Sequence, residues 1–174
     1  MKKSLCIGIF VLFAFMFSGC GTSTTSASSA SVPTATNAPT PTPTAVPKTA
    51  DQIVQALKQS LPIGDSFSYT ADNDPNHLLG RPGQYISKVN WIDTTLTTTN
   101  TGADISVGDG GSIETFASLT DANARFTYIQ GISRSSALFA EYEYQEGPYI
   151  LRVSKAFTPD QAQAYDAAFK KAVG

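Results

Sequence analysis

Apolar residues recur at helical spacing in three stretches of this chain, and two of the stretches begin with the same capping signal. Thr49 precedes one of them and has Gln52 three residues later, the arrangement in which each side chain binds the backbone N–H of the other residue. Thr158 and Gln161 repeat this capping box ahead of another stretch. We therefore expect helices over about residues 50–60 and 159–172.

A further helix is predicted over about residues 120–131. Thr120 or Asp121 is its expected N-cap, and Gly131 is expected to end it. Its apolar positions, which repeat at helical spacing, are Ala122, Phe126 and Ile129.

Between the helices lie five stretches with the β-branched and aromatic content of half-buried strands. They are residues 67–71, 85–93, 112–117, 138–144 and 149–155. The last two flank a turn sequence at residues 145–148 and are expected to form a hairpin. If Tyr144 faces Tyr149 in that hairpin, then Glu141 lies directly opposite Arg152.

The order helix, three strands, helix, hairpin, helix lacks the strand–helix alternation of a doubly wound sheet and indicates an α+β fold. We expect an antiparallel sheet of about five strands with the helices packed mainly on one face. The second and third helices are expected to cover this face with Phe126, Ile129, Tyr165 and Phe169.

The N-terminus has the regions of an export signal. Lys2 and Lys3 precede an apolar run of 13 residues, and Ser18 and Gly19 are small residues of the kind found at a cleavage site. At about 1.5 Å per residue the run covers roughly 20 Å, whereas the hydrocarbon core of a bilayer is about 30 Å thick. The run is therefore too short for a comfortable membrane span.

Cys20 follows directly, and residues 17–20 resemble a bacterial lipobox in which phenylalanine replaces the usual leucine. The resemblance implies cleavage after Gly19, and thus a lipoprotein signal peptide over residues 1–19, with a diacylglyceryl group on the Cys20 sulfur. Cys6 would leave with the signal peptide, so the domain would have no thiol chemistry. We expect the mature protein to be anchored in the cell membrane and to face the extracytoplasmic side. An ordinary signal peptide and an uncleaved anchor are the alternatives.

Residues 21–47 contain no charged side chain and consist mostly of Ser, Thr, Ala and Pro, which favours an extended, disordered linker. We assign the lipid anchor and linker to residues 20–48 and a single globular domain to residues 49–174. Without Lys2 and Lys3 the 12 Lys and Arg fall to 10, against 14 Asp and Glu, a net charge of −4. This acidic balance argues against nucleic acid as a partner. The expected partners are the membrane, through Cys20, and a small molecule or another protein.

Residues 72–85 hold the only histidine of the chain and a dense set of turn-forming residues. The segment DPNHLLGRPGQY at residues 74–85, followed by Ser87-Lys88-Val89, resembles a motif in lipoproteins and exported proteins of Gram-positive-type bacteria, including filamentous and soil-dwelling lineages. The resemblance implies a shared loop with either a structural or a recognition role, and it implies no activity.

Both roles remain open for this loop. In the structural interpretation, Leu78 and Leu79 insert into the core. The functional interpretation places a polar rim of four residues around a small anionic or sugar-like ligand: Asn76, His77, Arg81 and Tyr85.

Metal binding by the same loop is not expected. Asp72, Asp74 and Asn76 have the spacing that begins an EF-hand loop, but His77 replaces the turn glycine and Gly83 replaces the final glutamate. We predict neither a metal nor a cofactor.

No catalytic residue is predicted either. His77 has no accompanying Gly-x-Ser-x-Gly elbow, and the alternation of Glu141 and Glu143 is typical of the solvated face of a sheet. We expect a lipid-anchored extracytoplasmic module that binds a ligand or a protein. A cell-envelope hydrolase and an inhibitor or immunity-type domain are the alternatives.

Overall fold

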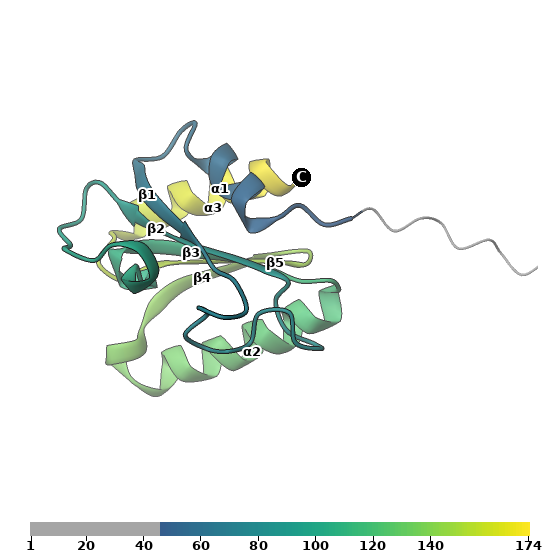
Figure 1. Ribbon diagram of the computed structural model, residues 1–174. Helices are drawn as coiled ribbons and strands as arrows, with labels where there is room; N and C mark the ends of the chain where they lie inside the picture. The colour runs from purple at the N-terminus through teal and green to yellow at the C-terminus, as the bar shows by residue number, and fades with distance from the viewer. Residues whose placement is uncertain (1–45) are drawn as a thin grey trace, which may run out of the picture. The chain divides into compact units, whose positions relative to one another are not determined.

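Five strands and three α-helices make up residues 46–174, the part of the chain that this computed structural model describes (Figure 1). The predicted signal peptide, Cys20 and most of the predicted linker lie outside the described residues. The elements in chain order are α1 (Ala50–Leu57), β1 (Ile63–Ser68), β2 (Ser87–Asp93), β3 (Gly110–Thr115), α2 (Leu119–Ser135), β4 (Glu141–Glu146), β5 (Tyr149–Ser154) and α3 (Pro159–Val173). Three short 3-10 turns, η1 (Gly102–Asp104), η2 (Val107–Asp109) and η3 (Ala137–Phe139), lie in the connections.

The strands form one antiparallel sheet in the order β1-β2-β3-β5-β4. The α+β class and the five-stranded antiparallel sheet predicted from the sequence are therefore confirmed. Strand β3 is central, and all six of its residues are buried because the sheet is covered on both faces.

Two helices, α1 and α3, pack on one face of the sheet, as expected for most of the helices (Figure 1). The main core lies between them and the sheet, where Trp91 stacks on Tyr165 with ring centroids 6.0 Å apart. Both helices begin with the predicted capping boxes, at Thr49 and at Thr158. These boxes satisfy backbone N–H groups that the first helical turn leaves unpaired.

Helix α2 lies on the opposite face of the sheet, so the expectation that the second and third helices cover the same face is wrong (Figure 1). Its residues Ala122 and Phe126 pack with Tyr85, Phe116 and Ile150 in a smaller apolar cluster. The rest of this sheet face is polar, and α2 contacts it through charged side chains, as described below. Because these contacts are partly ionic, the apolar stripe of α2 does not reveal which face the helix covers.

The bounds of α2 also differ from the prediction of residues 120–131. Its N-cap is Ser118, whose hydroxyl accepts a hydrogen bond from the Asp121 N–H. The helix continues through Gly131 to Ser135, because glycine in a helix interior costs only about 1 kcal/mol and the helix has no other stop signal there.

The β4–β5 hairpin has a tighter turn than the sequence suggests. Gly147, with φ of 54°, and Pro148 form a two-residue loop, so Tyr149 pairs with Glu146 and Arg152 lies directly opposite Glu143. The predicted register is therefore wrong by two residues. A shift of two keeps every side chain on its expected face, and the Glu141 carboxylate still reaches Arg152 diagonally, with bonds of 2.6 and 2.9 Å.

Candidate functional site

Polar side chains cover the sheet face beneath α2. Along each strand, residues on this face alternate with apolar residues of the main core, such as Val89 and Ile113. The polar residues come from three adjacent strands: Lys88 and Asn90 on β2 and Ser112 and Glu114 on β3 are buried, and Arg152 on β5 is 18% exposed. Buried polar groups in such number need partners, and these partners define the site.

A cavity of about 1030 Å³ lies over part of this face. Its floor includes Lys88, Asn90 and Arg152, one wall is α2 from Ala124 to Ile132, and the opposite wall is the segment at residues 103–108. We call this cavity the α2 cleft. Its volume is at the upper limit of the range of pockets that hold small organic ligands, about 300–1,000 Å³.

Helix α2 is joined to the floor of the cleft by Arg125. Its guanidinium binds both carboxylate oxygens of Glu114, at 2.9 and 3.0 Å, and the Glu114 side chain has no exposed surface. Arg152 adds a bond of 3.3 Å to the same carboxylate and is itself held by Glu141. The result is a continuous ionic network from α2 through β3 and β5 to β4.

This network keeps Glu114 and its two arginines charged. Burial alone raises the pKa of Glu114, but the hydrogen bonds and charge of Arg125, together with the charge of Arg152, outweigh burial and hold that pKa below its usual value. Burial lowers the pKa of Arg125, and Glu114 more than restores it. Removing one member would leave an uncompensated charge in the interior.

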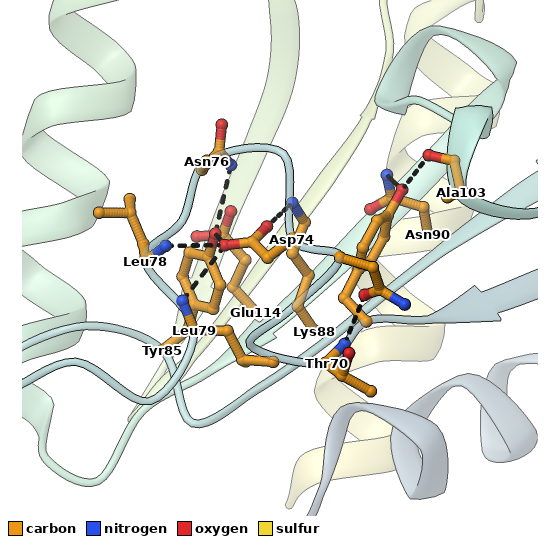
Figure 2. A network of polar contacts seen from close by, with 12 residues as sticks. Thr70, Asp74, Asn76, Leu78, Leu79, Tyr85, Lys88, Asn90, Ala103 and Glu114 are labelled. Carbon is orange, nitrogen blue, oxygen red and sulfur yellow. Dashed lines mark hydrogen bonds and ion pairs between the residues drawn. The ribbon is translucent and has the colours of Figure 1, made fainter.

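Asp74 organises the loop at residues 70–85, beside the cleft (Figure 2). One carboxylate oxygen of this wholly buried residue accepts the Tyr85 hydroxyl at 2.6 Å and the backbone N–H groups of Leu78 and Leu79 at 2.9 and 3.2 Å. The other accepts Lys88 Nζ at 2.9 Å. Burial raises the pKa of Asp74, but these hydrogen bonds lower it well below the usual range. The loop is therefore folded around a permanent negative charge.

Asn90 joins the floor of the cleft to the wall at residues 103–108. Its amide Nδ2 donates to the Tyr69 hydroxyl at 3.1 Å and to the Ile105 carbonyl at 2.7 Å. The Tyr69 hydroxyl in turn lies 3.0 Å from the Ala103 carbonyl and 2.9 Å from that of Ile105. Asn90 and Ala103 come close together in Figure 2 although they belong to separate parts of the chain. The wall is thus fixed by side chains of the floor.

Asp109 stabilises the wall at residues 103–108 through a second set of hydrogen bonds. Its carboxylate accepts bonds from the hydroxyls of Thr98 and Ser106 at 2.6 and 2.7 Å, from the Ser106 N–H at 2.7 Å, and from the amide of Asn100. Burial raises the pKa of Asp109, but these bonds lower it to about 2.

One row across this sheet face contains three polar atoms without a hydrogen-bond partner among the described residues. In the register of the sheet, Asn90 lies opposite Ser112, Ser112 lies opposite Arg152, and Arg152 lies opposite Glu143. Asn90 Oδ1, Ser112 Oγ and Glu143 Oε1 are the unpartnered atoms of this row. A buried polar atom without a partner costs about 1–3 kcal/mol, so each calls for an explanation.

The mouth of the cleft is apolar. Four of its lining side chains are large, hydrophobic and exposed: Tyr128, Ile132, Leu138 and Phe139. Leu138 is 81% exposed, and an exposed apolar patch of this kind is typical of an interaction or ligand-binding site. The sequence predicts the start of a strand at residues 138–140, but Leu138 and Phe139 form η3 and project at this mouth.

The four residues predicted to form a ligand rim occupy different environments. Tyr85 is wholly buried and packs edge-on against Phe116, and Asn76 lines the cleft and donates to the Tyr85 hydroxyl at 3.2 Å. His77 and Arg81 are exposed and do not line the cleft. Leu78 and Leu79 pack against the smaller apolar cluster, as the structural interpretation predicts.

Among residues 46–174, no cluster of three or more His, Cys, Asp or Glu side chains is arranged to hold a metal ion. Asp74, the middle member of the EF-hand-like triplet, is instead paired with Lys88. In the same part of the chain, no helix has the length and apolar character needed to cross a membrane.

Sequence reasoning misses the floor of the cleft. The polar residues at alternate positions of β2, β3 and β5 are visible in the sequence, but alternation of this kind, as at Glu141 and Glu143, is also typical of a solvated face. The missing signal is long-range: the partner of Glu114 is Arg125, on a helix, and a single sequence does not show which helix covers which face.

No protein-family model, curated protein or solved structure matches this chain. Its function is therefore inferred from the site itself.

Proposed function

We propose that this chain is a lipid-anchored, extracytoplasmic binding protein that holds a small molecule in the α2 cleft. The anchor is the lipid on Cys20, inferred from the lipobox-like sequence at residues 17–20. The ligand site is inferred from the cleft, and the two parts of the proposal are tested separately.

The observation that carries the ligand site is the combination of a fixed polar floor with an apolar mouth over one cavity of about 1030 Å³. Ligand sites are typically concave, mostly apolar, and supplied with a few positioned polar groups. Arg152 is such a group, because it lines the cleft with 18% of its side chain exposed and its guanidinium is fixed by Glu141 and Glu114. A preorganised floor of this kind lowers the entropy that a ligand loses on binding.

The ion pairs and hydrogen bonds of the acidic groups near the cleft favour a binding function over a hydrolytic one. Glu114 and Glu141 are both held by arginines, and Asp74 is held by Lys88 and Tyr85. Each carboxylate is thereby occupied, and the pKa values of Glu114 and Asp74 are lowered, whereas a general acid needs a raised pKa and access to substrate. Burial raises the pKa of Glu143, but this side chain does not line the cleft. His77 does not line the cleft.

The cleft is tested by blocking it. Ala124 is an exposed residue of α2 that lines the cleft, and Ala167 is an exposed residue of α3 on the other face of the sheet. The full chain in phosphatidylcholine nanodiscs is screened by saturation-transfer NMR against a mixture of sugars, amines, carboxylates and aromatic fragments. We expect at least one ligand whose signal is lost in Ala124→Trp and retained in the control Ala167→Trp. A screen without such a ligand contradicts the proposed ligand site.

The anchor is tested independently of the ligand. Cells expressing the chain are fed an alkyne fatty acid, and we expect label on the wild-type protein and none on Cys20→Ser. Equal labelling of the two proteins would contradict the lipid anchor.

A further inference from the structure

The mouth of the α2 cleft offers an accessible apolar surface to a ligand. Tyr128, Leu138 and Phe139 are 59%, 81% and 58% exposed, and Ile132 is 37% exposed. All four side chains line the cleft. Exposed apolar side chains at the border of a concave site are typical of a contact surface. Because a ligand can reach these side chains, they favour a molecule with an apolar body.

One cation of the cleft lining has no acidic partner within the described part of the chain. The lining cations are Lys88, Arg125, Arg152 and Lys155. The first three form ion pairs with carboxylates, whereas Lys155 is exposed and forms none among residues 46–174. A charged group of a ligand that reaches Lys155 is therefore expected to be negative.

Lys155 is held next to the apolar mouth. Its Nζ donates to the carbonyl oxygens of Ala137 and Leu138, at 2.9 and 3.3 Å. These bonds use two of the three ammonium hydrogens and leave the third for a ligand. Leu138 thus contributes its exposed side chain to the mouth and its carbonyl to Lys155. A positive charge and an apolar surface this close together suit an amphipathic anion.

Two acidic side chains also line the cleft, and they restrict where the anionic group can lie. Glu141 is occupied by Arg152 through hydrogen bonds of 2.6 and 2.9 Å. Asp104 is an exposed residue of the wall at residues 103–108 and forms no ion pair among the described residues. Because Asp104 repels a carboxylate, the favoured position for the anionic group is at Lys155, at the base of η3.

We propose that the α2 cleft binds an amphipathic monocarboxylic acid, with its carboxylate on Lys155 and its apolar body on Leu138 and Phe139. The inference rests on the proposed ligand site and specifies what occupies it. Of the anionic and sugar-like ligands expected from the sequence, it retains the anionic class. It also moves the recognition residues from the loop at residues 74–85 to η3 and to the residue that follows β5.

The test compares ligands that share an apolar body and differ in charge. The probes are 3-phenylpropionate, 3-phenylpropan-1-ol and 3-phenylpropylamine, together with hexanoate, hexan-1-ol and hexylamine. Each is titrated calorimetrically into the full chain in phosphatidylcholine nanodiscs at pH 7 and low salt, with empty nanodiscs as the blank. We expect saturable binding of at least one carboxylate. Its alcohol should bind at least about fivefold more weakly and its amine at least about tenfold more weakly.

Variants separate the charged part of the site from the apolar part. Lys155→Met should weaken the carboxylate at least about fivefold and change the affinity for the alcohol less than about twofold, whereas Lys155→Arg should keep the preference for the carboxylate. Phe139→Ser should weaken both ligands at least about tenfold. The matched controls are Lys171→Met and Leu119→Ser, at exposed residues that do not line the cleft, and they should change neither affinity.

The outcomes distinguish this inference from the proposed function. Equal affinities for the carboxylate, the alcohol and the amine would overturn the inference. Equal weakening of the carboxylate and the alcohol by Lys155→Met would also overturn it, because Lys155 would then only shape η3. Binding of a fragment in the earlier screen without binding of either carboxylate overturns the inference and leaves the proposed ligand site intact. A screen without any ligand overturns the proposed function itself.

Discussion

Arg125 of α2 binds both carboxylate oxygens of Glu114, a residue of the central strand β3 with no exposed surface. This pair explains how a helix with only two wholly buried side chains, Ala122 and Ile129, remains fixed on a polar sheet face. It also sets the distance between the wall and the floor of the α2 cleft. The pair is therefore a structural determinant of the site as well as of the fold.

Loss of Arg125 should destabilise the protein strongly. Arg125→Met leaves Glu114 buried with only the weaker contact from Arg152, and we expect a loss of about 3–5 kcal/mol in the free energy of unfolding. The double variant Glu114→Gln/Arg125→Met should cost less than the sum of the single variants, by at least about 1 kcal/mol. Urea unfolding measures the stability of the two single variants and of the double variant. It can be followed by the fluorescence of Trp91, which is the only tryptophan and is buried.

The exposed pair Lys170–Asp166 of α3 is the matched control for this cycle. Lys170→Met should change stability by less than about 0.5 kcal/mol. Additive losses in the Glu114 and Arg125 cycle would mean that the two side chains are not coupled.

The loop at residues 74–85 gives a second prediction that separates its two interpretations. Tyr85→Phe removes the 2.6 Å bond to Asp74 and should cost about 1–3 kcal/mol. Arg81→Ala alters an exposed side chain for which the structure shows no hydrogen bond, and should change stability by less than about 0.5 kcal/mol. Arg81→Ala should also leave cleft ligands bound with unchanged affinity. Lost binding in a stable Arg81→Ala protein would instead support the ligand rim predicted from the sequence.

Local signals in the sequence predict those parts of the fold whose causes are local. Both capping boxes lie within four residues, and Thr49 and Thr158 begin α1 and α3 as expected. The α+β class follows from the order of such elements. The predicted hairpin register is wrong by two residues because it depends on whether the turn uses two or four residues, and Gly147 with positive φ permits the shorter loop.

The candidate site is less accessible to sequence reasoning because its determinants are long-range. The loop at residues 74–85 is conspicuous in the sequence, yet of its predicted ligand residues only Asn76 lines the cleft. Arg152 and Lys155 are ordinary charged residues in and just after a strand, and they become informative only once the positions of α2 and η3 are known. What identifies Lys155 is that it lines the cleft without an acidic partner among the described residues, which no sequence pattern encodes.

Asp109 makes the wall of the cleft sensitive to acid. Its pKa falls from 3.8 to about 2 on folding, so the unfolded chain binds more protons than the folded protein between these values. The stabilisation of the folded protein by ionised Asp109 is fully present above about pH 4 and is lost as the pH falls through about 2. At about 1.4 kcal/mol per pH unit it amounts to roughly 2 kcal/mol. We expect the stability difference between wild type and Asp109→Asn to shrink by this amount between pH 5 and pH 2, measured by urea unfolding; a constant difference would contradict the assignment.

Substitution of glycine by alanine is expected to have opposite effects on stability at Gly111 and at Gly131. Gly111 of β3 lies against the Trp91 ring, and a Cβ there would also come within 2.8 Å of the Arg152 carbonyl oxygen, so Gly111→Ala should destabilise the protein by about 3 kcal/mol or more. A methyl group on Gly131 of α2 would meet no heavy atom within 4 Å beyond the backbone of its own helix, so Gly131→Ala should stabilise the protein by about 0.5–1 kcal/mol through helix propensity. Thermal unfolding of the two variants beside the wild type tests both effects. Destabilisation by Gly131→Ala would indicate that α2 ends at Gly131, as the sequence pattern alone predicts.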